Sequence, residues 1–184
     1  LYLSISPRHE TFLSFSVAHK EPTRADFKEA SGDPAATPRP ETMYDLEAGY
    51  LLKNGSLNLG LNLFGMFYTD QLIPTGELSN VGYPIMTNVS RSYRTGIELT
   101  LSLKPARPLT WNMNTTLSRN RIPRFTEYYT DYNTTDWSSK YLSLYLGEVD
   151  IAYSPEVTGS SDLKFAVNDR IGIHLISKYV GKQY

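Results

Sequence analysis

The segment RFTEYYTDYNTTDWSSKY, residues 124–141, is the richest of the long connecting segments in aromatic side chains and carboxylates. Aromatic faces can stack on sugars, corrins or catecholates, and carboxylates can orient a polar ligand. The segment is therefore a candidate ligand-binding loop. The residues assigned to this candidate site are Tyr128, Tyr129, Asp131, Tyr132, Asp136 and Trp137. The alternative is that the loop packs against its neighbours or covers the rim of the fold.

Other kinds of chemistry have little support in the sequence. The chain has no Cys, which excludes disulfides, thiolate metal sites and Cys nucleophiles. His9, His19 and His174 have no metal-site spacing, and the Gly-x-Ser-x-Gly nucleophile motif is absent. We therefore expect no enzyme activity, no metal site and no cofactor. The net charge of −1 offers no basic excess for phosphate backbones, so a nucleic-acid partner is not expected.

The segments that flank such loops alternate strictly between apolar and polar residues. In the stretch 92–104, one side carries Tyr93, Thr95, Ile97, Leu99, Leu101 and Leu103, and the other carries Ser92, Arg94, Gly96, Glu98, Thr100, Ser102 and Lys104. This period of two recurs along most of the chain and predicts an all-β fold. No apolar run reaches about 18 residues, so no transmembrane helix is predicted, whereas a barrel strand needs only about 9–11 alternating residues. The mean hydropathy of −0.36 does not separate these cases.

The connections between the predicted strands alternate in length. Short turns are predicted at 7–10, 53–55, 105–108 and 168–170, and Asn54-Gly55 predicts a type I′ hairpin turn. Long loops are predicted at 20–42, 69–89 and 121–147. This order predicts an up-and-down antiparallel sheet of about eight strands with all short turns at one end. The stretch 151–165 is interpreted as one long strand interrupted by a bulge, or alternatively as a further hairpin that would reverse the sides after it.

The apolar sides of these strands are monotonous. Leucines repeat at positions 57, 59, 61 and 63 and again at 99, 101 and 103. A protein core mixes side-chain sizes so that they interdigitate, whereas lipid tails require no such fit. The pattern therefore favours a transmembrane β-barrel over a soluble β-sheet module of carbohydrate-binding type. On this interpretation Glu47, Arg94, Glu98 and Lys104 face a hydrated lumen.

Several longer motifs resemble a known family. They are SFSVAHKEPTRADF (14–27), MYDLEAGYLLKNG (43–55), FYTDQLIPTGELSNVGYPIMTNVSRSYRTGIEL (67–99) and SKYVGKQY (177–184). Together they resemble the β-barrel of TonB-dependent outer-membrane receptors, in the branch common in Bacteroidetes. The resemblance covers nearly the whole chain in the expected order. It identifies residues 1–184 as the C-terminal part of a receptor barrel that is 22-stranded in this family, with the plug domain and the remaining strands absent.

The resemblance also implies a function and a set of partners. The parent receptor would import a scarce nutrient, such as an iron–siderophore, haem, cobalamin or a glycan, across the outer membrane of a Gram-negative bacterium. Its implied partners are outer-membrane lipid, its own plug domain, the TonB complex that supplies the energy, and the small-molecule nutrient. Glu47, Arg94, Glu98 and Lys104 would then meet the plug. A porin-like or autotransporter-like barrel without TonB coupling is the second alternative.

Overall fold

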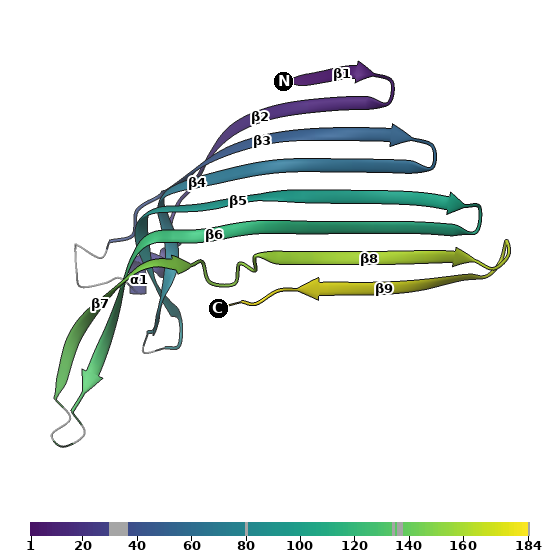
Figure 1. Cartoon of the computed structure of the whole chain (residues 1–184). Coiled ribbons are helices and arrows are strands. Elements are labelled where there is room, and N and C mark those ends of the chain that lie inside the picture. Colours follow the sequence, from purple (N-terminus) through teal and green to yellow (C-terminus); the bar gives the residue numbers. More distant parts are fainter. Residues whose placement is uncertain (30–36, 80, 134, 136–137, 184) are drawn as a thin grey trace.

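The structure is a computed structural model that describes residues 1–29, 37–79, 81–133, 135 and 138–183. This part of the chain forms one antiparallel sheet of nine strands and one short helix (Figure 1). The elements are β1 (Tyr2–Ser6), β2 (His9–Lys20), α1 (Arg24–Glu29), β3 (Glu41–Asn54), β4 (Leu57–Leu78), β5 (Pro84–Ala106), β6 (Leu109–Tyr132), β7 (Ser139–Asp150), β8 (Val157–Ala166) and β9 (Gly172–Val180). No helix in the described residues has the length and apolar character needed to cross a membrane.

The strand order confirms the predicted up-and-down sheet. Neighbours follow the order β1-β2-β3-β4-β5-β6-β8-β9, and β7 also pairs with β6. Both β7 and β8 run antiparallel to β6, so together they occupy one position, and the sheet has eight positions as expected. Short turns lie at one end of the sheet, called the turn end here, and α1 and the longer connections lie at the opposite loop end (Figure 1).

The interruption between β7 and β8 is the predicted bulge rather than a hairpin. The last β6–β7 pair joins Arg121 to Asp150, and the β6–β8 ladder ends at the pair of Leu117 and Val157. Residues 151–156 thus leave the ladder and the chain resumes in the same direction. Within this interruption Tyr153 adopts a left-handed φ of 57° and projects into solvent with 79% of its surface exposed.

Two of the three predicted long loops were wrong in extent. The segment 69–89 is mostly strand, because β4 continues to Leu78 and β5 begins at Pro84, and β6 and β7 likewise extend through most of 121–147. The connection from β2 to β3 contains α1, whose first turn is capped by reciprocal hydrogen bonds between Thr23 and Asp26. The turn after β3 was predicted in the right place, but neither Gly55 nor Ser56 has positive φ, so it is not type I′.

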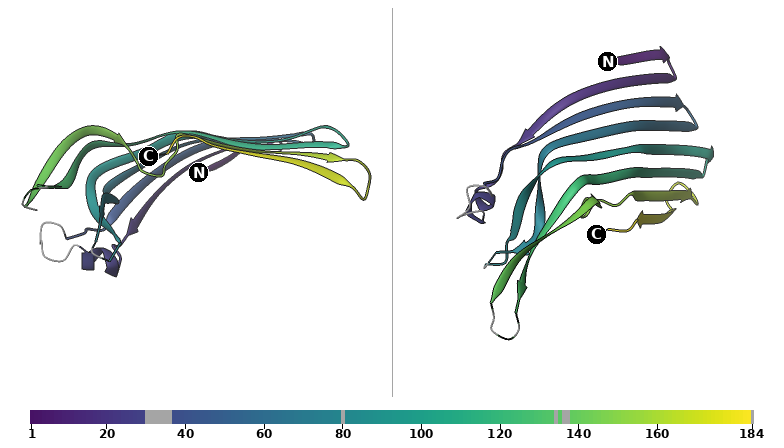
Figure 2. Two further views of the ribbon diagram at one scale, coloured as in Figure 1. Left: turned by 90° about the horizontal axis from the view of Figure 1, so that it is seen from below. Right: turned by 60° about the vertical axis from the view of Figure 1, so that its left-hand side comes forward.

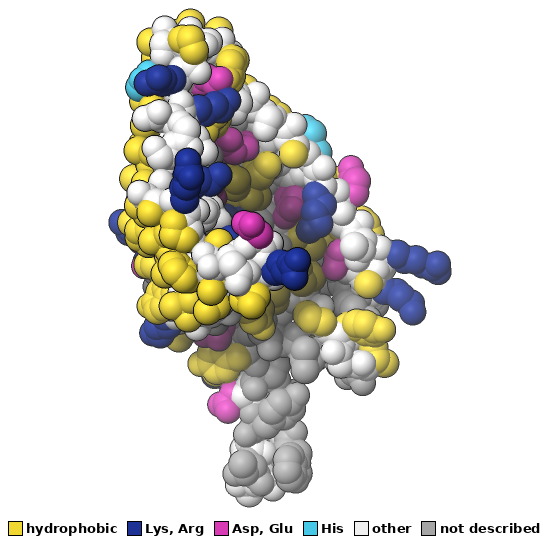
Figure 3. All heavy atoms as spheres, turned by 90° about the vertical axis from the view of Figure 1, so that its right-hand side faces the viewer, with side chains coloured by type: hydrophobic (Ala, Val, Ile, Leu, Met, Phe, Trp, Pro, Cys, Tyr) yellow, Lys and Arg dark blue, Asp and Glu magenta, His cyan; other side chains and the backbone are white. Residues whose placement is uncertain are grey.

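The sheet is curved, and its two faces differ in chemistry. Figure 2 shows the curvature, and Figure 3 shows charged side chains gathered in the hollow with hydrophobic side chains along the outer edge. We call these the hollow face and the outer face. The register places Arg94 beside Met66 and Asn120 in one row of the hollow face. Leu61 and Leu99 are paired in a row of the outer face.

The buried core is small for a chain of 20.8 kDa. Among the described hydrophobic residues, the buried ones are Ile73, Val89, Ile122 and Ile151, all at the loop end of the sheet. The outer face instead leaves large apolar side chains exposed: Leu13, Phe15, Leu46, Leu61, Leu63, Phe67, Ile97 and Leu117. A contiguous apolar surface of this kind marks contact with another apolar medium.

Candidate ligand-binding site

The candidate site lies where the sheet divides into two hairpins. The β5–β6 ladder ends at the pair of Tyr93 and Arg121, and beyond it β5 pairs with β4 while β6 pairs with β7. Pro123 comes two residues after Arg121 and has no N–H to donate to a ladder. A register shift follows between Ile122 and Phe125. The β4–β5 and β6–β7 hairpins therefore separate and leave a recess between them.

This hairpin recess has a volume of about 540 Å³ and is mostly apolar. Its apolar lining includes the core residues Ile73, Ile122 and Ile151, together with Phe125 and Val149. Its polar lining consists of Gln71, Thr75, Arg94, Glu127, Asp150 and Tyr153. An apolar hollow with a few converging polar groups is the usual architecture of a small-molecule site.

Arg94 is the cation of the hairpin recess. Its guanidinium carbon lies 4.9 Å from the centre of the Tyr68 ring, a cation–π contact that holds the side chain over the hollow face. No carboxylate among the described residues lies within ion-pair distance of it. Beside it, the Ser92 hydroxyl donates a hydrogen bond to the Gln71 side chain, and both residues are buried. The positive charge of Arg94 is therefore available to a ligand.

Part of the predicted ligand-binding segment lies at this recess. Glu127 lines it, and Tyr129 and Asp131 follow at alternate positions of β6, so their side chains leave the strand on the same side. Tyr129 is 42% exposed and Asp131 is also exposed. Asp136 and Trp137 lie outside the described residues, as do the side chains of Tyr128 and Tyr132. The prediction for those four residues stays a prediction.

The four residues expected to face a lumen share one face but do not form one cluster. Glu47 pairs across the strands with Phe64, and Glu98 pairs with Asn62 and Thr116. Both occupy different rows of the hollow face from Arg94. Lys104 lies on the same side of β5 at the turn end, where its backbone N–H donates to the Ser56 carbonyl. The charges are thus distributed along the hollow face.

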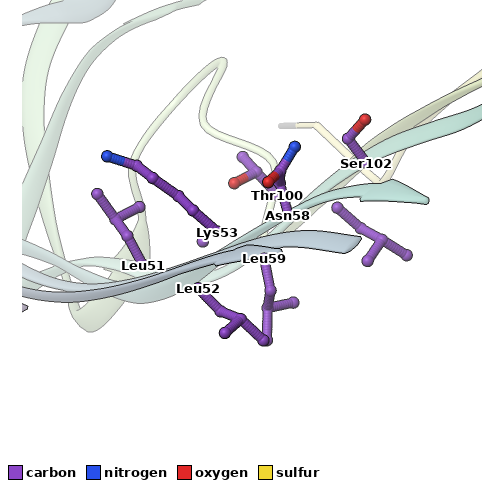
Figure 4. A pocket seen from close by; sticks show the side chains of 9 residues that line it. Leu51, Leu52, Lys53, Asn58, Leu59, Thr100 and Ser102 are labelled. Carbon is purple, nitrogen blue, oxygen red and sulfur yellow. The ribbon is translucent and has the colours of Figure 1, made fainter. Parts of the chain in front are cut away.

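A second, shallower depression lies on the hollow face near the turn end. Figure 4 shows Leu51, Lys53, Asn58, Thr100 and Ser102 on one side of the strands, with Leu52 and Leu59 on the opposite side. The depression has a volume of about 350 Å³, and Gly60 is among its lining residues. A Cβ at Gly60 would clash with the Thr100 hydroxyl, so any larger residue here would force the Thr100 side chain to move.

A charged network fixes the junction at which the hairpins separate. The Arg121 guanidinium contacts Asp150 and Glu156, with 2.7 Å to the Glu156 carboxylate, and Arg119 contacts Glu148 at 2.7 Å. These contacts connect β6 to the end of β7 and to the bulge before β8. Within the described residues, no group of three His, Asp or Glu side chains could hold a metal ion.

Sequence reasoning missed the apolar lining of the recess. Ile73, Ile122 and Ile151 come from three separate segments, none of which shows the long alternation that marked the other strands. Their convergence depends on the register shift after Ile122 and on the bulge at 151–156. The available signal was Ile122-Pro123, because a proline inside an otherwise extended run predicts the end of a ladder.

Comparison with known proteins agrees with this architecture. A family model described as TonB dependent receptor-like, beta-barrel, matches residues 2–184. Among curated proteins, none matches the sequence. Similar solved structures include the ferric-catecholate import receptor Fiu from K12 E. coli (TM-score 0.68, 14% identity, 100% of this chain and 24% of that one) and the ferric enterobactin receptor PfeA from Pseudomonas aeruginosa (0.63, 18%, 99% and 27%). The copper transporter OprC is also similar (0.67, 14%, 97% and 25%).

These comparisons carry different weight. The solved structures share the fold at low identity, and this chain spans about a quarter of their length. The family model covers nearly every residue of the chain. The strand order, the exposed apolar outer face and the charged hollow face agree with a sector of such a barrel. The chain belongs to the TonB-dependent receptor-like β-barrel family.

Proposed function

We propose that this chain is a sector of an outer-membrane receptor that imports a scarce nutrient into a Gram-negative bacterium with energy supplied through TonB. Membership of the receptor barrel family supports this proposal. The names of similar solved structures, which are ferric enterobactin, ferric-catecholate and copper proteins, support a metal-related cargo. The transport cycle requires no covalent step, so the protein is proposed to be a transporter and not an enzyme.

The observation that carries the proposal is the two-faced sheet with a recess at its loop end. Exposed leucines on the outer face match a hydrocarbon medium, in which each strand still satisfies its backbone through its neighbours. The opposite face carries charged side chains that require water or a polar partner. The hairpin recess lies beyond the leucine rows, at the end that would receive a ligand from outside.

The plug domain is the proposed partner of the hollow face. Glu47, Glu98 and Lys104 have no ion-pair partner among the described residues and share this face with Arg94. A plug inside the barrel would meet these charges, and a pull transmitted through TonB would rearrange those contacts. Energy coupling on this account is mechanical and reaches the present chain through the plug.

The lining of the hairpin recess offers a cargo with aromatic or conjugated groups one cation, Arg94, and one carboxylate, Glu127, that has no ion pair among the described residues. Arg94 supplies positive charge and Phe125 supplies aromatic surface in the recess, and Tyr129 lies two residues beyond Glu127 on the same side of β6. A ferric siderophore of catecholate type combines these properties. Haem, cobalamin and glycans remain in the test panel because aromatic surfaces also stack on them.

The site is tested by cargo affinity in the complete receptor. The double variant Arg94→Gln/Tyr129→Ala removes the cation and one exposed aromatic ring. Tyr145→Ala is the matched control, because Tyr145 pairs with Thr126 and so leaves the hairpin on the opposite side from Glu127. We expect the double variant to raise the Kd for the true cargo by about tenfold or more, because hydrogen bonds to charged groups contribute about 1.5–3 kcal/mol. The control should stay within about twofold. An equal Kd for both variants and the parent would remove the recess from the cargo site.

The energy source is tested separately by uptake in cells. Labelled cargo should accumulate when the complete receptor and TonB are both present, and accumulation should stop when TonB is deleted. The receptor should still bind cargo in the deletion strain, because binding precedes the energised step. Uptake that continues without TonB would instead favour a porin-like barrel.

A further inference from the structure

Another recess, distinct from the hairpin recess and called the wedge here, lies beside the point where the two hairpins separate. Two arginines line it. It has a volume of about 500 Å³ and is lined by Ser90 and Arg91 from β5 and by Pro123 and Arg124 from β6. The last β5–β6 pair joins Tyr93 to Arg121, so these four residues come directly after the end of the ladder. Pro123 cannot extend the ladder, and the two strands open as a wedge. None of these residues lines the hairpin recess proposed for cargo.

The two arginines of this wedge differ from their neighbours in how their charge is compensated. Arg119 and Arg121 each contact acidic residues, with 2.7 Å between Arg119 and Glu148. The side chains of Arg91 and Arg124 have no hydrogen bond or ion pair with any residue in the described part of the chain. Two like charges that line one recess repel each other unless an anion lies between them. The adjacent carboxylates are already engaged by Arg119 and Arg121.

The position of Arg91 relates the wedge to the membrane surface. Tyr44, Phe67 and Tyr93 form a cross-strand row on the outer face, and such aromatic rows mark the membrane–water interface. Arg91 comes two residues before Tyr93 in β5. It occupies the next outward-facing position toward the loop end, about 7 Å from Tyr93 at the usual strand rise. This is the level of lipid headgroups rather than of acyl chains.

We propose that Arg91 and Arg124 form a binding site for a phosphate monoester group. Planar guanidinium groups bind phosphate through paired hydrogen bonds, and two of them can hold one dianionic group from opposite walls. The phosphate belongs to a phosphorylated headgroup of the outer leaflet or to a small soluble phosphate, and both present the same terminal oxygens.

The test compares these two sources on the complete receptor in detergent. Native mass spectrometry follows binding of bis-phosphorylated lipid A and of the same lipid after phosphate removal, and calorimetry follows inorganic phosphate. Arg91→Gln/Arg124→Gln should weaken binding of the phosphorylated probe by about tenfold or more, because both charged hydrogen-bond donors are removed. Arg91→Lys/Arg124→Lys should give an intermediate loss, because lysine keeps the charge but loses the fork. The matched control Arg107→Gln removes the same charge at the turn end and should bind like the parent.

Each outcome has a defined meaning. The headgroup source is supported if the glutamine variant loses binding of phosphorylated lipid A and binds the lipid equally with and without its phosphates. Loss of inorganic phosphate binding supports the soluble source. Equal binding of both probes by the parent, the glutamine variant and the control overturns the proposal. The heat-dependent shift of the folded barrel on a gel identifies a variant that has not folded, and the lysine variant then decides the question.

Discussion

Apolar side chains are exposed in the leucine rows of the sheet but buried in the hairpins at its loop end. In the sheet, Leu63, Ile97 and Leu117 lie in one cross-strand row and remain exposed. In the hairpins, Ile122 and Ile151 are only 3% and 4% exposed, because they join Ile73 and Val89 in one buried cluster at the loop end. The same chain therefore relies on an external apolar medium in one region and on its own core in the other.

The difference shows why the two regions follow different sequence rules. Side chains that face lipid need no complementary partner, so a repeated leucine at every second position is sufficient. Hairpins that are surrounded by water must instead bury their apolar residues inside the protein. They combine a register shift, a bulge and a charged junction at Arg121. Substitutions that separate these two environments therefore test the account.

The largest effect is expected from a charge placed on the outer face. Leu99 lies near the middle of the leucine rows, between Leu61 and Thr115. Leu99→Arg should destabilise the complete receptor in lipid vesicles by about 2–4 kcal/mol, the cost of arginine near the bilayer midplane. The adjacent residue Glu98 is exposed on the hollow face, so Glu98→Arg should cost much less, because the new charge stays out of the hydrocarbon. Denaturant titration of vesicle-inserted receptor measures both, and equal losses would contradict the assignment of faces.

A smaller loss is expected when the hairpin core is truncated. Ile122→Ala should destabilise the hairpins by about 2 kcal/mol, the lower end of the range for such cavities, because the cluster is small. Leu117→Ala on the same strand should cost less than about 1 kcal/mol, since lipid tails can occupy the vacated space and leave no cavity. Amide hydrogen exchange across 121–150 should increase for Ile122→Ala only. A greater loss for Leu117→Ala would show that the protein packs against that face.

The smallest of the three effects concerns the junction between the regions. Arg121→Gln leaves Asp150 and Glu156 without their cation, and the side chain of Arg121 is 19% exposed. We expect about 1–2 kcal/mol of local destabilisation, seen as faster exchange at 147–157 while the strands of the leucine rows stay protected. Arg119→Gln is the control, because its side chain is 60% exposed and its pair with Glu148 is screened by solvent. Faster exchange throughout the sheet would show that the two regions unfold together.

Much of the sheet could be predicted from the sequence because period-two alternation is a strong signal when one face meets a uniform medium. Residues 93–103 show this, because the register of β5 with β4 and β6 places their side chains on the two faces of the sheet as the alternation predicts. The bulge before β8 was also predicted, since Pro155 cannot extend a ladder. Strand direction after the bulge followed correctly from that interpretation.

The candidate site could be predicted only in part. Glu127 falls within the predicted ligand-binding segment 124–141 and Arg94 within a predicted strand, but nothing in the sequence placed both at one recess. The hairpins were taken for loops because Gly76, Gly82 and Pro84 break the alternation over 69–89. Arg91 and Arg124 were missed because 32 residues separate them and only the register of β5 with β6 brings them together.

The central claim is that the leucine face meets lipid and the opposite face meets water. The chain contains no Cys, so single cysteines can be introduced from 97 to 102 in a complete receptor freed of other cysteines and then spin-labelled. In lipid vesicles, labels at 97, 99 and 101 should collide preferentially with dissolved oxygen, and labels at 98, 100 and 102 with a water-soluble nickel complex. This alternation of period two is the predicted result. Access of the nickel complex to 97, 99 and 101 equal to that at 98, 100 and 102 would contradict the account.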